Sequence, residues 1–352
     1  MADRPDSTRE GFWAEFRDAV APRTFALVCG VLMIQILFIA SYVGAFHNPT
    51  PHGIRVQIAA PAPAAQQLAA ELNATAGHPV NATVATSAEA ARAAVRSGNV
   101  AGALVVDPTG TTDSVLVASG GGYALASATQ AILTHAVEAQ RRTAKVSDLV
   151  PLQSGDYHGL TGFYLVVGWL VGGYLMASML GVARGARPAT TRRATIRLVS
   201  AVPYAIVSGL TGALVVDQWL GALTGHYWAL AGLGALLVLA AVATTIALQV
   251  LAGVIGIGIT VLLFVVAGNP SAGGAYQAPL LPGFFRFANR VIPNGPGVDA
   301  VKSIVYFAGA GVAGHLAVIC AWIVGGVLVT VIGSRRLAGA ADADADAQLA
   351  ES

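Results

Sequence analysis

The chain of 352 residues is 55% hydrophobic and only 11% charged, and its mean hydropathy is +0.66. Soluble globular domains carry roughly 25% charged residues, so this composition excludes an ordinary soluble protein and indicates an integral membrane protein. The formal net charge is +2, and the cationic residues gather in loops rather than along one face, which argues against nucleic acid as a partner.

The N-terminal residues 1–23 are expected on the cytoplasmic side as an amphipathic helix. Ser7 and Glu10 have the spacing of a capping box at the start of the segment 6–20. One face of this helix would carry Phe12, Trp13, Phe16 and Val20. Such a helix lies in the headgroup plane of a membrane. Its role is either that of a surface anchor or that of a docking site for a cytoplasmic partner.

Uncharged windows of about 20 residues are long enough to cross a bilayer as helices. The sequence predicts six membrane-spanning helices, at 24–46, 161–183, 196–216, two within 227–268, and 308–333. A tight turn near Gln249–Gly253 is expected to divide the long block. The first window is too long, and starts too late, for a cleaved signal peptide, so we expect it to remain as an anchor.

Orientation follows from arginine, because cationic residues of short loops stay on the cytoplasmic side. The loop between the second and third windows contains Arg184, Arg187, Arg192, Arg193 and Arg197. This loop is therefore predicted to be cytoplasmic, with both termini on its side and with 47–160 and 268–306 on the other. The abundance of arginine, alanine, glycine and valine points to a bacterial source, and hence to a bacterial cell membrane.

The extracytoplasmic segment 47–160 has the length of one compact domain. Short β-rich runs occur at 53–61, 101–108 and 113–119, and helical composition occurs at 62–74 and 87–98. The second of these helices has Ser87 as its N-cap and Gly98 as its stop. A long helix over 123–146 is expected to return the chain to the membrane. The expected fold is an α-helical polytopic membrane protein with a small α/β domain between helices 1 and 2.

The stretch 267–297 breaks the apolar pattern with glycine, proline, asparagine and arginine. Irregular backbone at membrane depth is tolerated only inside protein or beside water, so 268–306 is expected as an outer re-entrant element within the five-helix domain 161–333. Short interfacial helices are predicted at 281–293 and 297–307. Together they would form the rim of an outer vestibule, with candidate residues Asn269, Pro270, Phe284, Phe285, Arg286, Asn289 and Arg290. The alternative is an ordinary exposed loop with an aromatic anchor.

The chemistry of common enzymes is missing from the sequence. Its two lysines, Lys145 and Lys302, do not stand in a phosphate-binding loop of the G-x-x-x-x-G-K-[ST] type. The histidines do not pair at metal-ligand spacing, and the expected spans hold almost no ionisable group beyond Asp217 and His315 near outer ends. We therefore expect no cofactor, no metal and no enzymatic activity, and we do not favour a proton-driven carrier. The alanine-aspartate tail 334–352 is predicted to be disordered and cytoplasmic.

The order of one span, an outer domain, and five spans with a re-entrant element before the last resembles the permease subunits of type-two ABC exporters. More narrowly, it is similar to the bacterial phage infection protein family. The stretches that carry the resemblance are SAEAARAAVRSGNVAGALVVDP at 87–108, SGDYHGLTGFYL at 154–165 and GNPSAGGAYQAPLLPGFFRFANRVIPNGPG at 268–297.

The resemblance implies a homodimeric or heterodimeric permease that moves an amphipathic or hydrophobic substrate, such as a lipid-like molecule or a drug, outward. A separate ATP-binding subunit would power it and would contact Phe12, Trp13, Phe16, Arg187, Arg192 and Arg193. These arginines could equally serve only as topology determinants and as contacts for anionic lipid. The competing class is a non-transporting cell-surface protein whose outer domain binds an envelope, secretion-system or phage component.

Overall fold

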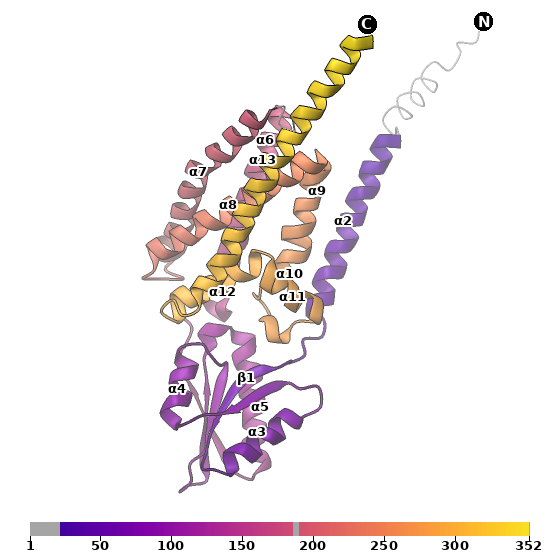
Figure 1. Ribbon diagram of the computed structural model, residues 1–352. Coiled ribbons are helices and arrows are strands. Elements are labelled where there is room, and N and C mark those ends of the chain that lie inside the picture. The colour runs from indigo at the N-terminus through magenta and orange to yellow at the C-terminus, as the bar shows by residue number, and fades with distance from the viewer. Residues whose placement is uncertain (1–21, 186–189, 352) are drawn as a thin grey trace, which may run out of the picture.

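The computed structural model describes residues 22–185 and 190–351. Within them, five helices are long and apolar enough to cross a membrane. They are α2 (Pro22–Phe46), α6 (Thr161–Arg184), α7 (Thr191–Leu214), α8 (Tyr227–Ala252) and α13 (Val312–Glu351). Figure 1 shows these helices at one end of the molecule and a small α/β domain at the other. The chain is a membrane protein with a helical bundle and a separate mixed sheet.

The sixth predicted span is not confirmed, because its segment is shorter than the other five. The 17-residue apolar helix Ile255–Ser271 comprises α9 (Ile255–Val261), a π-helical segment Leu262–Gly268, and α10 (Asn269–Ser271). At 1.5 Å per residue, 17 residues extend about 25 Å, somewhat less than a hydrocarbon core of about 30 Å. The turn expected near 249–253 is present, since α8 ends at Ala252 and Gly253 has a φ of +62°.

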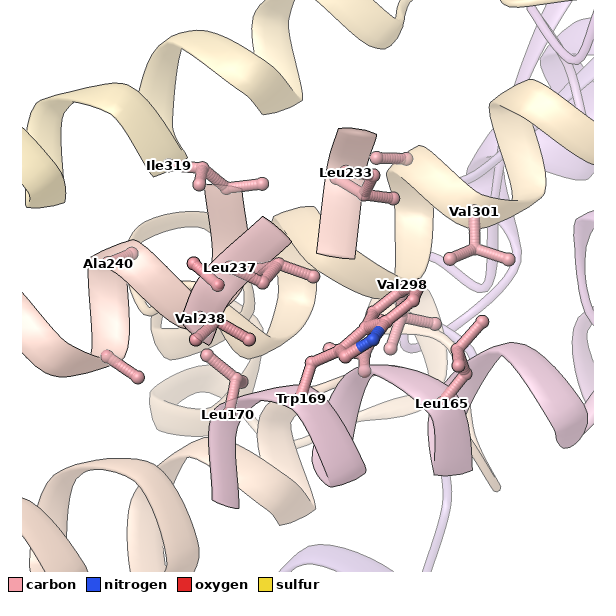
Figure 2. Packing of buried hydrophobic residues seen from close by; sticks show 14 of the residues in the cluster. Leu165, Trp169, Leu170, Leu233, Leu237, Val238, Ala240, Val298, Val301 and Ile319 are labelled. Atoms are coloured by element: carbon pink, nitrogen blue, oxygen red, sulfur yellow. The ribbon is translucent and has the colours of Figure 1, made fainter. Parts of the chain in front are cut away.

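Helix α8 is the centre of the bundle, with α6, α7 and α13 packed around it. Figure 2 shows Trp169 and Leu170 of α6 facing side chains of α8 and of α12 (Asn294–Tyr306), among them Leu237, Val238 and Val298. The Trp169 indole is 3% exposed, and its Nε1 donates a hydrogen bond to the Ser208 carbonyl of α7 at 3.0 Å. One aromatic side chain thus connects three membrane helices.

Glycines let these helices approach closely. A Cβ at Gly212 of α7 or Gly234 of α8 would collide with the Trp169 indole. On other helices, a Cβ at Gly173 would lie 2.8 Å from the Val238 carbonyl oxygen, and one at Gly326 would lie 2.7 Å from the backbone of Ala243. Lipid tails are as apolar as leucine, so close packing of this kind is a main source of cohesion in a membrane bundle.

The α/β domain contains a five-stranded sheet of order β2-β1-β3-β4-β5. Its strands are β1 (Ile54–Ala59), β2 (Val80–Val84), β3 (Gly102–Val105), β4 (Thr112–Val117) and β5 (Thr143–Asp148), and all neighbours are parallel except β3 and β4. Helices α3 (Ala64–Ala74) and α5 (Tyr123–Ala139) share a core with one face of the sheet, and α4 (Ala88–Arg96) packs on the other. The predicted strands at 53–61, 101–108 and 113–119 are present, and Ser87 caps α4 through Ala90 N at 3.0 Å.

A bidentate ion pair fixes the end of this domain where β3, β4 and β5 meet. Arg142 donates two hydrogen bonds of 2.7 Å to the carboxylate of Asp113, which is 2% exposed. Its Nη2 also donates to the carbonyl of Asp107 at 2.8 Å, and Asp107 N donates to Asp113 at 2.9 Å. The buried carboxylate therefore has a partner on each of its oxygens.

Two further expectations differ from the structure. The helix predicted over 123–146 is wrong in its second part: α5 ends at Ala139, Arg141 turns the chain with a φ of +58°, and β5 follows. β5 was missed because it is a largely exposed edge strand, without the alternation that marks a half-buried one. The tail 334–351, predicted to be disordered, continues α13 as a helix. This part of the chain is rich in alanine, the strongest helix former, and contains no proline.

Both short helices expected before the last span are present. α11 (Gly283–Val291) follows a 3₁₀ turn at Ala278–Leu280, and α12 leads towards α13. α11 is amphipathic, with Phe284 and Phe287 more than 60% exposed and Phe285 buried. Figure 1 shows this segment between the membrane helices and the sheet. This segment, residues 278–306, therefore lies where the bundle meets the α/β domain, and we call it the seat of that domain.

Candidate functional site

The candidate functional site is the junction between the α/β domain and this seat. Its domain side is the loop Gly120–Gly122 at the start of α5, and its bundle side is formed by Gln277 and the end of α12. A Cβ at Gly120 would lie 2.7 Å from the Tyr306 ring, and one at Gly98 would lie 3.1 Å from the Phe307 ring. The domain lacks side chains where the aromatic rings of the bundle enter it.

A buried carboxylate joins the junction to α6. Asp156 is 2% exposed, and its Oδ2 accepts a hydrogen bond of 2.5 Å from the Tyr306 hydroxyl. Its Oδ1 accepts from the backbone N–H of Thr161, the first residue of α6, at 2.9 Å. A carboxylate is favoured at this position, because the first N–H groups of a helix have no partner within it and carry partial positive charge. Asp156 thus ties α12 to the start of a membrane helix.

The environment of Tyr306 keeps its hydroxyl protonated. Burial, followed by the hydrogen bond to Asp156 and the charge of that carboxylate, raises the pKa of Tyr306 well above its ordinary value near 10. At neutral pH the phenol is therefore a permanent donor to Asp156. The backbone N–H of Gln153 adds a longer hydrogen bond to the same hydroxyl at 3.4 Å.

Gln277 makes a second connection across the junction. Its side chain is 5% exposed, and its Oε1 accepts from Leu125 N in the first turn of α5 at 2.9 Å. Its Nε2 donates to the carbonyls of Gly273 and Gly274 at 3.3 and 3.1 Å. A Cβ at Gly122 would collide with this side chain. The bundle therefore satisfies an orphan N–H of a helix in the other domain.

The segment between β5 and α6 is fastened at a third point. The Gln153 amide accepts from Thr224 N at 2.8 Å and donates to the Thr224 carbonyl at 3.3 Å, in the connection between α7 and α8.

Lys302 of α12 donates to the Gly273 carbonyl at 3.1 Å and lies 3.4 Å from Asp299. The space left among Asp156, Lys302 and Tyr306 is about 10 Å³, room for about one water molecule.

The predicted vestibule residues divide into two groups. Pro270, Phe285 and Asn289 are buried, and Asn269 is half-buried. Asn269 accepts from Asn294 at 2.9 Å, and Asn289 donates to the Ser271 carbonyl at 2.8 Å. These hydrogen bonds hold the turn of the chain together. Phe284 and Arg290 are exposed on α11, and Arg286 is intermediate.

The predicted contacts of a partner ATPase are only partly visible. Phe12, Trp13, Phe16 and Arg187 lie outside the described residues. Arg192 and Arg193 are exposed in the first turn of α7, which Thr190 caps by accepting from Arg193 N at 3.2 Å. Figure 1 shows this turn at the end of the bundle opposite the α/β domain.

Sequence reasoning missed the residues that build the junction. Tyr306 and Asp156 are 150 positions apart, and Leu125 and Gln277 are 152 apart, so no local pattern links them. One signal was present: an acidic residue shortly before a predicted span, as in SGDYHG, is typical of a helix N-terminus. No sequence pattern around Tyr306 indicated that it would be the partner of Asp156.

No protein-family model, no curated protein and no solved structure matches this chain. Among the described residues there is no group of three or more His, Cys, Asp or Glu that could hold a metal ion. What the structure shows at the junction is a set of hydrogen bonds between distant parts of one chain.

Proposed function

We propose that this chain is the permease subunit of an exporter that moves an amphipathic or hydrophobic substrate outward. The observation that carries the proposal is the junction itself. Tyr306, Asp156 and the first turn of α6 form one hydrogen-bonded unit. The Tyr306 ring packs against Gly120 of the α/β domain, and Gln277 accepts a hydrogen bond from Leu125 N of α5, so a shift of α6 or α12 would be transmitted to the domain. In a transporter that alternates between two states, such a link would carry the movement of the membrane helices to the outer domain.

The energy for export would come from a separate ATPase, since the sequence has no phosphate-binding loop. Arg192 and Arg193 are suitably placed for such a partner, because they are exposed at the end opposite the domain. In this proposal that end faces the cytoplasm of a bacterial cell, as the arginine-rich loop favours. Two permease chains, identical or different, would form the membrane part, as in the exporters that the sequence resembles.

The first test is to purify the tagged full-length protein in mild detergent and to identify co-purifying chains by mass spectrometry. The proposal expects a stoichiometric partner that carries a phosphate-binding loop. Substitution of both Arg192 and Arg193 by glutamate should abolish its capture without lowering expression. If no ATPase is captured by the wild-type protein, the export proposal fails; if capture is unchanged in the double variant, these two arginines are not the contact.

The second candidate is a non-transporting surface protein whose α/β domain binds an envelope, secretion-system or phage component. One specific observation favours it: the domain has an open groove between α3 and α5, away from the junction. Capture of an envelope protein in place of an ATPase in the same experiment would support this candidate, and the membrane helices would then be an anchor.

A further inference from the structure

The α/β domain has a concave surface that the junction does not use. A groove of about 580 Å³ lies between α3 and α5, on the sheet face opposite α4. Sites for small organic ligands have volumes of about 300–1,000 Å³ and are lined mainly by apolar side chains. The size of this groove therefore suits a drug-sized molecule.

The groove is apolar with two ionisable residues. Leu68 and Leu72 of α3, only 6% and 7% exposed, lie on one side, and Ile132 and Ala136 of α5 lie on the other. Glu71 of α3 and His135 of α5 are both among the lining residues and both are exposed. No lysine or arginine lines the groove. The groove thus combines an apolar lining with one acidic side chain, that of Glu71.

Glu71 retains acceptor capacity for a ligand. Gln67, one turn earlier, donates to its Oε1 at 3.0 Å, which orients the carboxylate. The second oxygen, Oε2, is then available for a charge-assisted hydrogen bond, the stronger kind of hydrogen bond. A ligand with a protonated amine would satisfy it, whereas a ligand with a carboxylate or phosphate would be repelled.

From this complementarity we propose that the α3–α5 groove binds an amphipathic amine, with its apolar body against Leu72 and Ile132 and its ammonium group at Glu71. His135 lines the same groove from α5, on the side opposite Glu71. The proposal goes beyond the export function, because binding needs neither an ATPase nor movement of the membrane helices. Each of the two proposals can fail without the other.

The test uses the full chain in lipid nanodiscs and two fluorescent probes of similar size. Dansylcadaverine is a primary amine, and dansyl-6-aminohexanoate carries the same fluorophore with an anionic end. After subtraction of empty nanodiscs, the amine should show saturable binding at least about threefold tighter than the anion, since exposed charge pairs contribute up to about 1 kcal/mol, a factor of about five. Glu71→Gln should remove this preference and keep the groove.

A matched pair of tryptophan substitutions locates the site. Ala131 is exposed and lines the groove, so Ala131→Trp fills it and should weaken binding of the amine at least tenfold. Ala93 is exposed on α4, on the other sheet face, so Ala93→Trp should leave binding unchanged. If Ala131→Trp lowers the unfolding temperature, Ala139→Trp, at another exposed lining position, takes its place.

Three results would overturn the proposal. The first is equal affinity for the amine and the anion, and the second is equal binding by the Ala131→Trp and Ala93→Trp proteins. The third is a light-scattering mass of two chains that falls to one chain in Ala131→Trp, because the groove would then be covered by a second copy of the protein rather than by a small molecule.

Discussion

Replacing Tyr306 by phenylalanine would remove one oxygen atom from the junction and leave the ring in place. Asp156, 2% exposed, would lose the donor to its Oδ2 and keep only the Thr161 N–H at Oδ1. A hydrogen bond to a charged group contributes about 1.5–3 kcal/mol. Since 1.4 kcal/mol is a factor of ten, the opening of the junction should become roughly 10- to 100-fold more frequent in Tyr306→Phe.

Hydrogen exchange followed by mass spectrometry measures this opening in the full-length protein. The peptide that covers 149–161 contains the Thr161 amide and the segment fastened by Gln153, so its exchange should accelerate in Tyr306→Phe. Exchange in the centre of α8 should not change. Local opening of this kind requires only that the junction separate, and the bundle can remain folded.

Tyr157→Phe is the matched control. This residue adjoins Asp156 and loses the same atom, but its side chain is 81% exposed. Its exchange pattern should equal that of the wild type. If the peptide 149–161 exchanges no faster in Tyr306→Phe than in Tyr157→Phe, the hydroxyl of Tyr306 does not hold the junction, and the mechanical argument for the proposed function is refuted.

The remaining predictions concern ionisation and packing. The difference in tyrosinate absorbance between wild type and Tyr306→Phe should titrate with a midpoint above pH 10, because the closed junction raises the pKa of Tyr306. The closed junction loses stability only as the pH rises above 10, because Tyr306 then ionises in the open form before it ionises in the closed form. A midpoint at pH 10 would contradict this. Arg142→Met should destabilise the α/β domain, because the buried Asp113 carboxylate loses its ion pair, and a lower midpoint of chemical denaturation should show it. Gly234→Val should lower the thermal unfolding temperature and shift the emission of Trp169, since the new side chain collides with the indole; an unchanged spectrum would contradict the packing.

The membrane character and the α/β composition could be predicted because both are written locally. Apolar windows gave the five long helices, and the turn at Gly253 fell where a glycine divides an apolar block. The Ser87 cap and the Gly98 stop bounded α4 correctly. In each case neighbouring residues carry the whole signal, through length, a cap or a positive φ.

Features set by distant partners could not be predicted in the same way. β5 lies at one edge of the sheet and is paired only with β4, so its sequence shows a weak burial pattern. The junction depends on contacts across about 150 residues. Gly120 was visible only as part of a glycine run, and the need for glycine arises from Tyr306. A sequence shows that a residue is small, but the side chain that requires it to be small comes from the fold.

The polar residues of 267–297 show how one composition serves two purposes. The sequence suggested a vestibule because asparagine and glycine interrupt an apolar block. In the structure the amides of Asn289, Asn294 and Gln277 donate to backbone carbonyls of Ser271, Phe264 and the glycines Gly273 and Gly274. A buried carbonyl without a hydrogen-bond donor costs free energy. These side chains supply the donors, and so they stabilise an irregular turn beside a membrane.

Within the described segment 267–297, Arg290 is the exposed charged residue, and it lies on α11 together with the exposed rings of Phe284 and Phe287. Such a face, with aromatic rings beside an arginine, is typical of a helix lying at a membrane surface. The buried side chains of Asn289 and Asn294, in contrast, hydrogen-bond from the seat of the α/β domain to backbone carbonyls. In the proposed exporter, these hydrogen bonds of the seat, together with those of Tyr306 and Gln277, would let the movement of α6 and α12 reach the domain.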